Sequence, residues 1–253
     1  MVPGGWGKEG MGAGGGARNW CGRRGKGDNG RVGIAMACVA RKEHAFVNAR
    51  LYLPREWTKD RGRREGAGVP ATVEFQTRHE LALEMLKEEG GRLPHAWVAG
   101  DDEMGRPSGF RRELRTADER YLLAVPSNLL IRDIEVAPPE YAGRGRHSKV
   151  PFARLDRWRR ALPEGVWTRI EVRDGEKGPL VIEAVKRRIE ARTETGGTGP
   201  EELLFVTRER QADGTYKHDY YLSNAHPDTS FKQLAHVAKP ENRTEESPTP
   251  AAG

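Results

Sequence analysis

The order of hydrophobic and polar positions predicts strands in the first third of the chain. Two apolar runs, 32–40 (VGIAMACVA) and 45–53 (AFVNARLYL), flank a short polar turn, which predicts a pair of antiparallel strands. Residues 1–30 are rich in glycine, whose ordering entropy disfavours regular structure, so we expect a loop there. The charged connection 55–69 has room for a short helix.

The middle of the chain alternates between helical and strand patterns. Thr77 and Glu80 have the spacing of a capping box, and Ser108 is a candidate cap for a second helix. The expected helix, strand, helix and strand cover residues 78–89, 95–100, 108–115 and 121–126. Connections of this length imply parallel strands covered by helices. Ligands of open α/β sheets bind beyond the carboxyl ends of the strands, where this pattern places Asp101.

The last third of the chain predicts an antiparallel β structure followed by one helix. Strand-like segments occupy residues 167–173, 180–192, 202–208 and 217–222. Asp174-Gly175 and Asp213-Gly214 have the composition of hairpin turns between them. A final helix is expected from about Asp228, and Pro240 interrupts it.

Composition and charge narrow the function classes. The chain has 253 residues and a net charge of +6, and residues 1–64 hold 14 Lys and Arg against five acids, a net of +9. A basic N-terminal segment of this kind is typical of a protein that binds a polyanion such as nucleic acid. An Arg- and Gly-rich surface that binds no partner would have the same composition. The longest apolar run is half of what a membrane span needs. Two cysteines without a CxxC spacing argue against a disulfide framework or a Cys-based zinc site.

Few short motifs carry chemistry. Residues 25–30 match GxGxxG but lead into a strand instead of a helix, so we reject a dinucleotide site. The loop with Arg144, Arg146 and Lys149 is either a phosphate contact or a solvated loop. The acidic triplet 101–103 is either a hard-metal ligand set or a helix N-cap cluster.

Several longer strings resemble one family, the DDE-type transposases of bacterial insertion sequences. They are Trp20–Arg23, Arg50–Trp57, Trp97–Asp101 with Gly105 after it, Leu123–Pro126 and Tyr220–Asn224. The similarity runs from about Trp20 to about Glu246 and implies an α/β fold with an RNase H-like mixed sheet, flanking helices and an antiparallel β insertion. The expected segments are a glycine-rich N-terminal part (1–30), the first part of the catalytic core (31–130) and the β-rich insertion (131–224). The final core helix (225–246) and a disordered tail (247–253) follow.

The resemblance also implies a site and partners. In the family, three carboxylates hold two Mg²⁺ or Mn²⁺ ions that activate the attacking and leaving oxygens of a phosphodiester. Asp101 matches the second acid and Glu245 the third, with Asp102 and Glu246 as alternates. The resemblance implies a DNA contact at Arg243, and Arg144, Arg146 and Lys149 of the basic loop are further candidate DNA contacts. The implied partners are double-stranded DNA, at the element's ends and its target, and a second copy or an intact transposase. No membrane is expected, and the expected location is the cytoplasm, at the nucleoid.

The chain departs from the family pattern near both ends. The string Gly5–Gly10 (GWGKEG) fits the one that follows the first catalytic Asp, which puts Val2 at that Asp's position. Residues 4–16 are mostly glycine where the central strand belongs, a helical DNA-binding region is missing before them, and 247–250 (SPTP) replaces a basic helix. We therefore expect a transposase fragment, truncated at both ends and inactive alone. The alternatives are a non-catalytic DNA-binding or dimerising remnant, an unrelated metal-dependent nuclease, and a decayed gene product.

Overall fold

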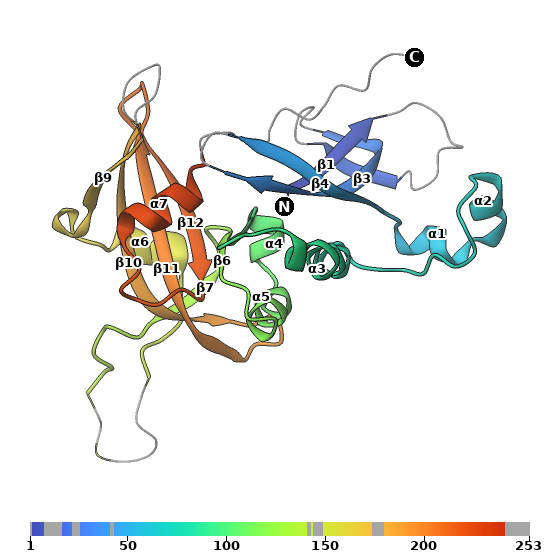
Figure 1. Ribbon diagram of the computed structural model, residues 1–253. Helices are drawn as coiled ribbons and strands as arrows, with labels where there is room; N and C mark the ends of the chain where they lie inside the picture. The colour runs from blue at the N-terminus through green and yellow to red at the C-terminus, as the bar shows by residue number, and fades with distance from the viewer. Residues whose placement is uncertain are drawn as a thin grey trace. The chain divides into compact units, whose positions relative to one another are not determined.

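The computed structural model forms two compact units along the chain (Figure 1). One unit contains the chain up to His95, and the other contains Ala96–Pro240. The residues that the structure describes are 2–7, 17–21, 26–40, 43–140, 143, 149–173 and 180–240.

The first unit is built on a sheet of antiparallel strands. Its strands are β1 Val2–Gly7, β2 Ala17–Cys21, β3 Lys26–Val39 and β4 His44–Tyr52. β3 pairs with each of the other three, which confirms the predicted pair 32–40 and 45–53. The expectation of a loop over residues 1–30 is wrong for β1, β2 and the start of β3. Glycine keeps its backbone N–H and C=O groups, so the long strand β3 can pair with glycine-rich segments through the backbone alone.

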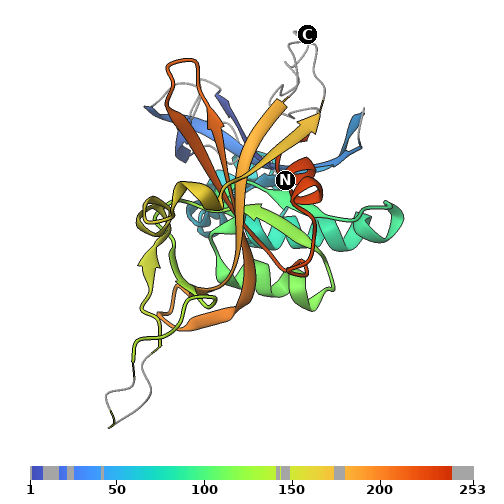
Figure 2. The ribbon, with the colours of Figure 1, turned by 90° about the vertical axis from the view of Figure 1, so that its left-hand side faces the viewer.

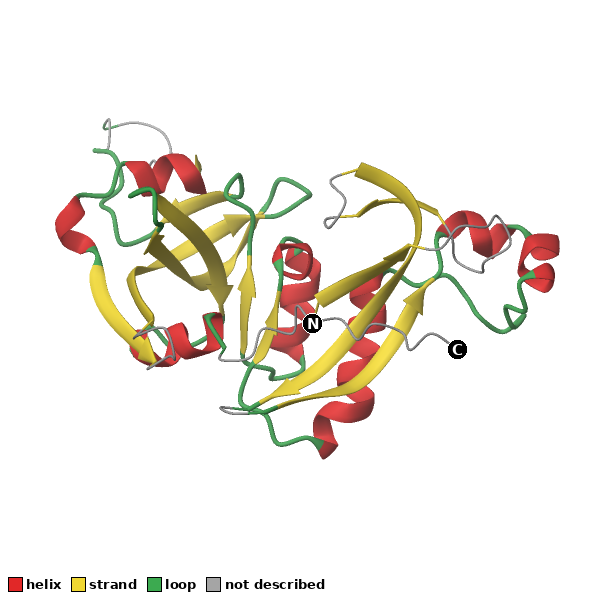
Figure 3. Cartoon of the chain, turned by 90° about the horizontal axis from the view of Figure 1, so that it is seen from above, coloured by secondary structure: helices red, strands yellow, loops and turns green. Residues whose placement is uncertain are grey.

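One helix packs against the alternating apolar face of the first unit's sheet. Val32, Ile34 and Met36 on β3 are buried, which is the period of two that a half-buried strand requires. Helix α3 (Arg78–Glu89) contacts β3 and β4 (Figure 3). The predicted capping box at its start is confirmed, because the Thr77 side chain accepts from the Glu80 N–H and the Glu80 side chain accepts from the Thr77 N–H.

The connections of the first unit contain short helical segments. The charged connection holds α1 (Arg55–Lys59) and α2 (Arg61–Gly66), as the sequence suggests. The 3-10 turn η1 (Gly90–Arg92) ends α3 at the glycine pair.

The second unit contains a mixed sheet. Its strands are β5 Val98–Gly100, β6 Tyr121–Ala124, β7 Leu130–Asp133, β8 Ala153–Arg154, β9 Thr168–Arg173, β10 Leu180–Arg192, β11 Thr198–Arg210 and β12 Tyr216–Ser223. The order is β5-β6-β12-β11-β10-β7-β8, with β9 also paired to β10. The predicted parallel pair is β5 and β6, and the other pairs are antiparallel, as expected for the later strands.

The later antiparallel strands continue the sheet that holds the parallel pair. β12 pairs with β6 with Leu222 opposite Leu123, so the β insertion and the helix–strand part share one sheet. Figure 2 shows the long strands β10 and β11 side by side. Joining the two parts in this way makes β11 a central strand that is buried on both faces.

Helices cover both faces of this central region. Leu203 and Phe205 belong to one core cluster, and Leu204 and Val206 belong to the other. The first cluster includes Leu234 from α7 (Phe231–Ala238), which is the predicted final helix, and the second includes Leu155 from α6. The remaining elements are α4 Asp102–Gly105, α5 Ser108–Thr116, α6 Leu155–Arg160 and the turn η2 Glu164–Val166. Within the part of the chain that is described, no helix has the length and apolar character of a membrane span.

Candidate active site

Asp101 lies directly after strand β5, at its carboxyl end. It is the N-cap of α4, and its carboxylate accepts a hydrogen bond from the Met104 N–H at 3.2 Å. The sequence alone does not decide whether the acidic triplet 101–103 is a set of metal ligands or a helix N-cap cluster. The structure shows the capping role directly, and it also places the carboxylate at the strand end where α/β sheets bind ligands.

The surroundings of Asp101 differ from those of its neighbours in the triplet. Burial raises the pKa of the Asp101 carboxyl, and the hydrogen bond from the Met104 N–H opposes this shift without cancelling it. Asp102 is exposed and Glu103 is half-buried. Desolvation raises the free energy of the ionised form of a carboxylate, and therefore its pKa. Perturbed pKa values of this kind are common among functional carboxylates.

Close packing of α4 on strand β6 fixes the position of this carboxylate. A Cβ atom on Gly105 would lie 1.9 Å from the carbonyl oxygen of Ala124, so only glycine fits there. A Cβ on Gly100 would lie 2.9 Å from the Met104 Cβ. Since Met104 is fully buried under this contact, α4 has little room to move.

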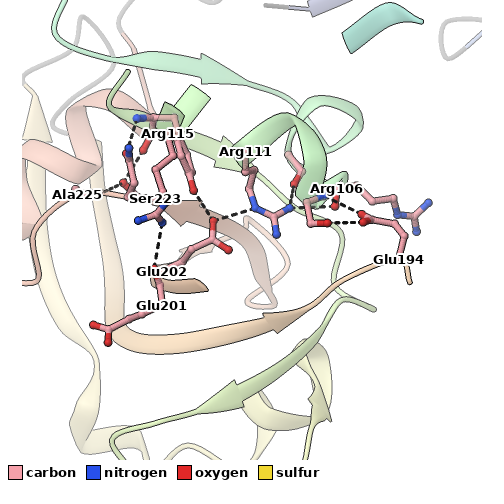
Figure 4. A network of polar contacts seen from close by, with 12 residues as sticks. Arg106, Arg111, Arg115, Glu194, Glu201, Glu202, Ser223 and Ala225 are labelled. Carbon is pink, nitrogen blue, oxygen red and sulfur yellow. Dashed lines mark hydrogen bonds and ion pairs between the residues drawn. The ribbon is translucent and has the colours of Figure 1, made fainter. Parts of the chain in front are cut away.

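A buried ion pair secures the other end of α4 (Figure 4). Arg111, on α5, donates from Nη1 to the carbonyl oxygens of Gly105 and Arg106. Its Nε donates to Glu202 Oε1 on β11 at 2.9 Å. Arg111 and Glu202 are each only 3% exposed, so the short helix that begins at Asp101 is tied to the centre of the sheet by two desolvated charges.

Tyr121, at the start of β6, completes this buried network. Its hydroxyl donates to Glu202 Oε1 at 2.6 Å. Burial and the negative charge of Glu202 raise the pKa of the Tyr121 phenol, so the hydroxyl keeps its proton and remains a donor. Two donors on one oxygen of Glu202 compensate part of the cost of burying that carboxylate.

The Tyr-Tyr-Leu-Ser-Asn string has a structural explanation in this region. Asn224 accepts from the Tyr121 N–H at 2.9 Å and donates to the Glu119 carbonyl at 2.8 Å. Ser223 donates from Oγ to the Tyr121 carbonyl and accepts from the Ala225 N–H (Figure 4). The end of β12 therefore holds the start of β6, the strand on which α4 packs.

The prediction that Ser108 caps α5 is wrong. The helix begins at Ser108, whose N–H and Oγ both donate to the carboxylate of Glu194 in the β10–β11 turn. Hydrogen bonds from Ser108 lower the pKa of Glu194 more than its partial burial raises it, so it is ionised at neutral pH. A carboxylate is favourable at a helix N-terminus, but sequence patterns do not connect residues that are 86 positions apart.

The structure places only some of the site residues predicted from the sequence. Asp101 and Asp102 lie at the end of β5, and Lys149 is exposed in the segment before β8. The other predicted residues, Glu245, Glu246, Arg243, Arg144 and Arg146, lie outside the described residues. The Arg111–Glu202 pair and the Glu194 contact were not predicted, because neither follows a local periodicity.

The described residues do not form a complete two-metal site. Among them, no three His, Cys, Asp or Glu side chains come together in a group that could hold a metal ion. Asp101 and Asp102 supply carboxylate oxygens of the kind that Mg²⁺ prefers. Two adjacent carboxylates alone fall short of the set that a pair of bridged ions requires.

The mixed sheet with flanking helices defines a class, the RNase H-like α/β domains. A family model described as DDE superfamily endonuclease matches residues 5–179, which include Asp101 and Gly105. The chain therefore belongs to the DDE superfamily endonucleases and contains a DDE-type transposase domain. No curated protein matches the chain. The family acts on DNA and generally depends on divalent metal ions.

We expect Asp101→Asn to raise the thermal stability of the protein at pH 7. Because the folded-state pKa of Asp101 is raised, ionising this carboxyl costs folding free energy as the pH rises through its unfolded and folded values. Asparagine removes the charge and still caps a helix. The gain in melting temperature should shrink as the pH falls, and disappear below about pH 3, where the native carboxyl is protonated in both states.

Thermal unfolding of both proteins between pH 3 and pH 7 tests this expectation. Asp102→Asn is the matched control, since it removes the charge of an exposed neighbour and should change the melting temperature less. An Asp101→Asn protein that melts below the native one at pH 7 would show that the charge is stabilising.

Proposed function

We propose that this chain is the catalytic domain of a transposase, in which Asp101 is the second of three metal-binding carboxylates and valine replaces the first. The observation that carries the proposal is the position of Asp101, partly buried at the end of β5 on a helix that packs against β6. The family match across this region supports the same assignment. The reaction class is hydrolysis of a phosphodiester at the end of a DNA element, followed by strand transfer into target DNA.

The remaining proposed site residues come from the family pattern and from the basic loop at residues 144–149. Glu245 is the proposed third carboxylate, with Glu246 as its alternate, and Asp102 is the alternate to Asp101. The proposed ions are Mg²⁺ or Mn²⁺. Arg243 is the proposed contact to a phosphate near that acid, and Arg144, Arg146 and Lys149 are proposed DNA contacts earlier in the chain. The partners are the ends of an insertion sequence, its target DNA, and a second protein copy.

We infer that the chain does not cut DNA alone. Val2, at the position of the first acid, has a hydrocarbon side chain that cannot bind a metal ion or offset its charge. Losing one group that stabilises charge in a transition state typically costs about 10²–10³ in rate. A metal site with an incomplete carboxylate set loses affinity for the ions as well.

A plasmid assay tests this inference. The purified chain is incubated with supercoiled plasmid in Mg²⁺ or Mn²⁺, and both a mobility shift and the nicked form are measured. We expect a shift without nicking. Metal-dependent nicking by the native chain that Asp101→Asn abolishes would contradict the inactivity and support Asp101 as a ligand.

A second candidate function is a non-catalytic DNA-binding or dimerising protein that modulates an intact transposase. The net charge of +9 in residues 1–64 favours it. This function predicts that added chain reduces the rate of DNA cleavage by an intact transposase that recognises the same ends. No DNA binding at 50 mM salt, together with no effect on the intact enzyme, would remove it.

A further inference from the structure

A shallow hollow of about 260 Å³ lies next to the C-terminal end of α4. Three segments of the second unit line it, namely the end of α4, the connection after β6 and the β10–β11 turn. The residues used below are Arg106, Asn128, Arg192 and Glu194, and all four line the hollow. The hollow thus brings together groups from distant parts of the chain.

Two arginines make the hollow basic. Arg106 and Arg192 are both exposed, and among the described residues neither takes part in an ion pair. Arg106 donates from Nη2 to the side-chain oxygen of Asn128 at 3.3 Å. The Arg192 guanidinium carbon lies 5.9 Å from the centre of the Phe152 ring. Arg106 therefore bonds to a neutral amide and Arg192 stacks near a neutral ring, so both charges remain uncompensated.

Glu194 does not neutralise these arginines. Its carboxylate accepts from the N–H and Oγ of Ser108, at the start of α5. The partial positive charge of a helix N-terminus compensates a carboxylate held in this way. The hollow therefore keeps two guanidinium groups for an external anion.

The hollow lies close to the candidate catalytic carboxylate. Arg106 follows α4 directly, and its N–H donates to the carbonyl oxygen of Asp102 at 3.1 Å. The five residue steps from Asp101 to Arg106 correspond to a rise of about 7.5 Å along a helix. A strand of DNA that passes Asp101 can thus reach the hollow with a neighbouring phosphate.

We propose that this hollow binds a backbone phosphate of the DNA strand that runs past Asp101, with Arg106 and Arg192 as its ligands. The inference rests on the proposed function and adds a substrate-binding site to it. Guanidinium groups match phosphate oxygens with paired N–H donors, which suits them better than ammonium groups to such a contact. With its oxygen engaged by Arg106, the Asn128 amide keeps its NH₂ group as a further donor.

Salt-dependent DNA binding tests the proposal. Fluorescence anisotropy measures the binding of a labelled duplex between 50 and 200 mM NaCl by the native chain and by the double variant Arg106→Gln, Arg192→Gln. The slope of log K against log salt concentration should fall in magnitude by about 1 for each arginine removed. The loss of affinity should be the same on two duplexes of unrelated sequence, because phosphate contacts carry no base information.

Arg210→Gln is the matched control. Arg210 is an exposed arginine at the far end of β11, the strand that starts near the hollow. It lies 12 residues after Thr198, the first residue of β11, which is about 40 Å along the strand. This substitution removes one arginine charge and should leave the slope close to that of the native chain. Thermal unfolding should show that all three proteins are equally folded, as expected for exposed side chains.

The outcomes separate this inference from the proposed function. A native chain that binds no duplex at 50 mM NaCl overturns the proposed function and the site together. Binding by the native chain with an unchanged slope in the double variant overturns the phosphate site alone. A slope that falls equally for each arginine removed, Arg210 included, also overturns it, because the effect is then one of net charge.

Discussion

Gly105→Ala is expected to destabilise the second unit by at least about 3 kcal/mol, at the upper end of what overpacking usually costs. The added methyl group would lie 1.9 Å from the Ala124 carbonyl oxygen and 2.9 Å from its carbonyl carbon. Both atoms belong to the backbone, which cannot rotate away as a side chain can. Relief requires α4 to move off β6, and Asp101 at the start of α4 must move with it. Urea denaturation measures the loss.

Gly109→Ala is the matched control for this change. Gly109 lies in helix α5, and a Cβ atom there would meet nothing within 4 Å. Alanine favours a helix over glycine by about 0.8–1 kcal/mol, so this variant should be more stable than the native protein. Equal and small effects at the two positions would show that α4 does not pack tightly on β6.

Arg111→Leu is expected to cost about 3–5 kcal/mol of unfolding free energy. The change leaves Glu202 as a buried carboxylate without its cationic partner, and it leaves the carbonyls at the end of α4 without their donor. The side chains of both partners are almost completely buried, at 3% and 1% exposure, so water does not replace the lost contact. Urea denaturation of the variant, followed by tryptophan fluorescence, measures the difference.

Two further variants separate the charge effect from a loss of packing. Arg112→Leu on the same helix changes a side chain that is 71% exposed and should cost less than about 0.5 kcal/mol. The double variant Arg111→Leu, Glu202→Leu removes both charges and should recover a large part of the lost stability. A double variant that is less stable than Arg111→Leu alone would indicate that the network stabilises by its hydrogen bonds instead.

Local patterns in the sequence predict much of the fold. The alternation in 32–40 corresponds to β3, and the capping box at Thr77 correctly marks the start of α3. The helix–strand order places β5 and β6 in parallel, and this is what puts Asp101 at a strand end. These features follow from periods of two and 3.6 residues and from cap chemistry, which act over a few positions.

The sequence does not predict features that depend on distant partners. The glycine-rich N-terminal segments β1 and β2 form strands because they pair with the long strand β3. The conformational preferences of glycine do not indicate this pairing. Arg111 and Glu202 are 91 positions apart, and both look like surface charges in the sequence. Their burial is decided by the pairing of β12 with β6, which brings β11 to the centre of the sheet.

The central proposal is that Asp101 is a catalytic carboxylate of a DDE site and that Val2 stands at the position of the first acid. Nicking of supercoiled plasmid in Mn²⁺ by the native chain, by Val2→Asp and by Val2→Asp combined with Asp101→Asn tests it most directly. The account predicts no nicking by the native chain, nicking by Val2→Asp, and its loss when Asp101→Asn is added. Metal-dependent nicking that persists after Asp101→Asn would contradict it.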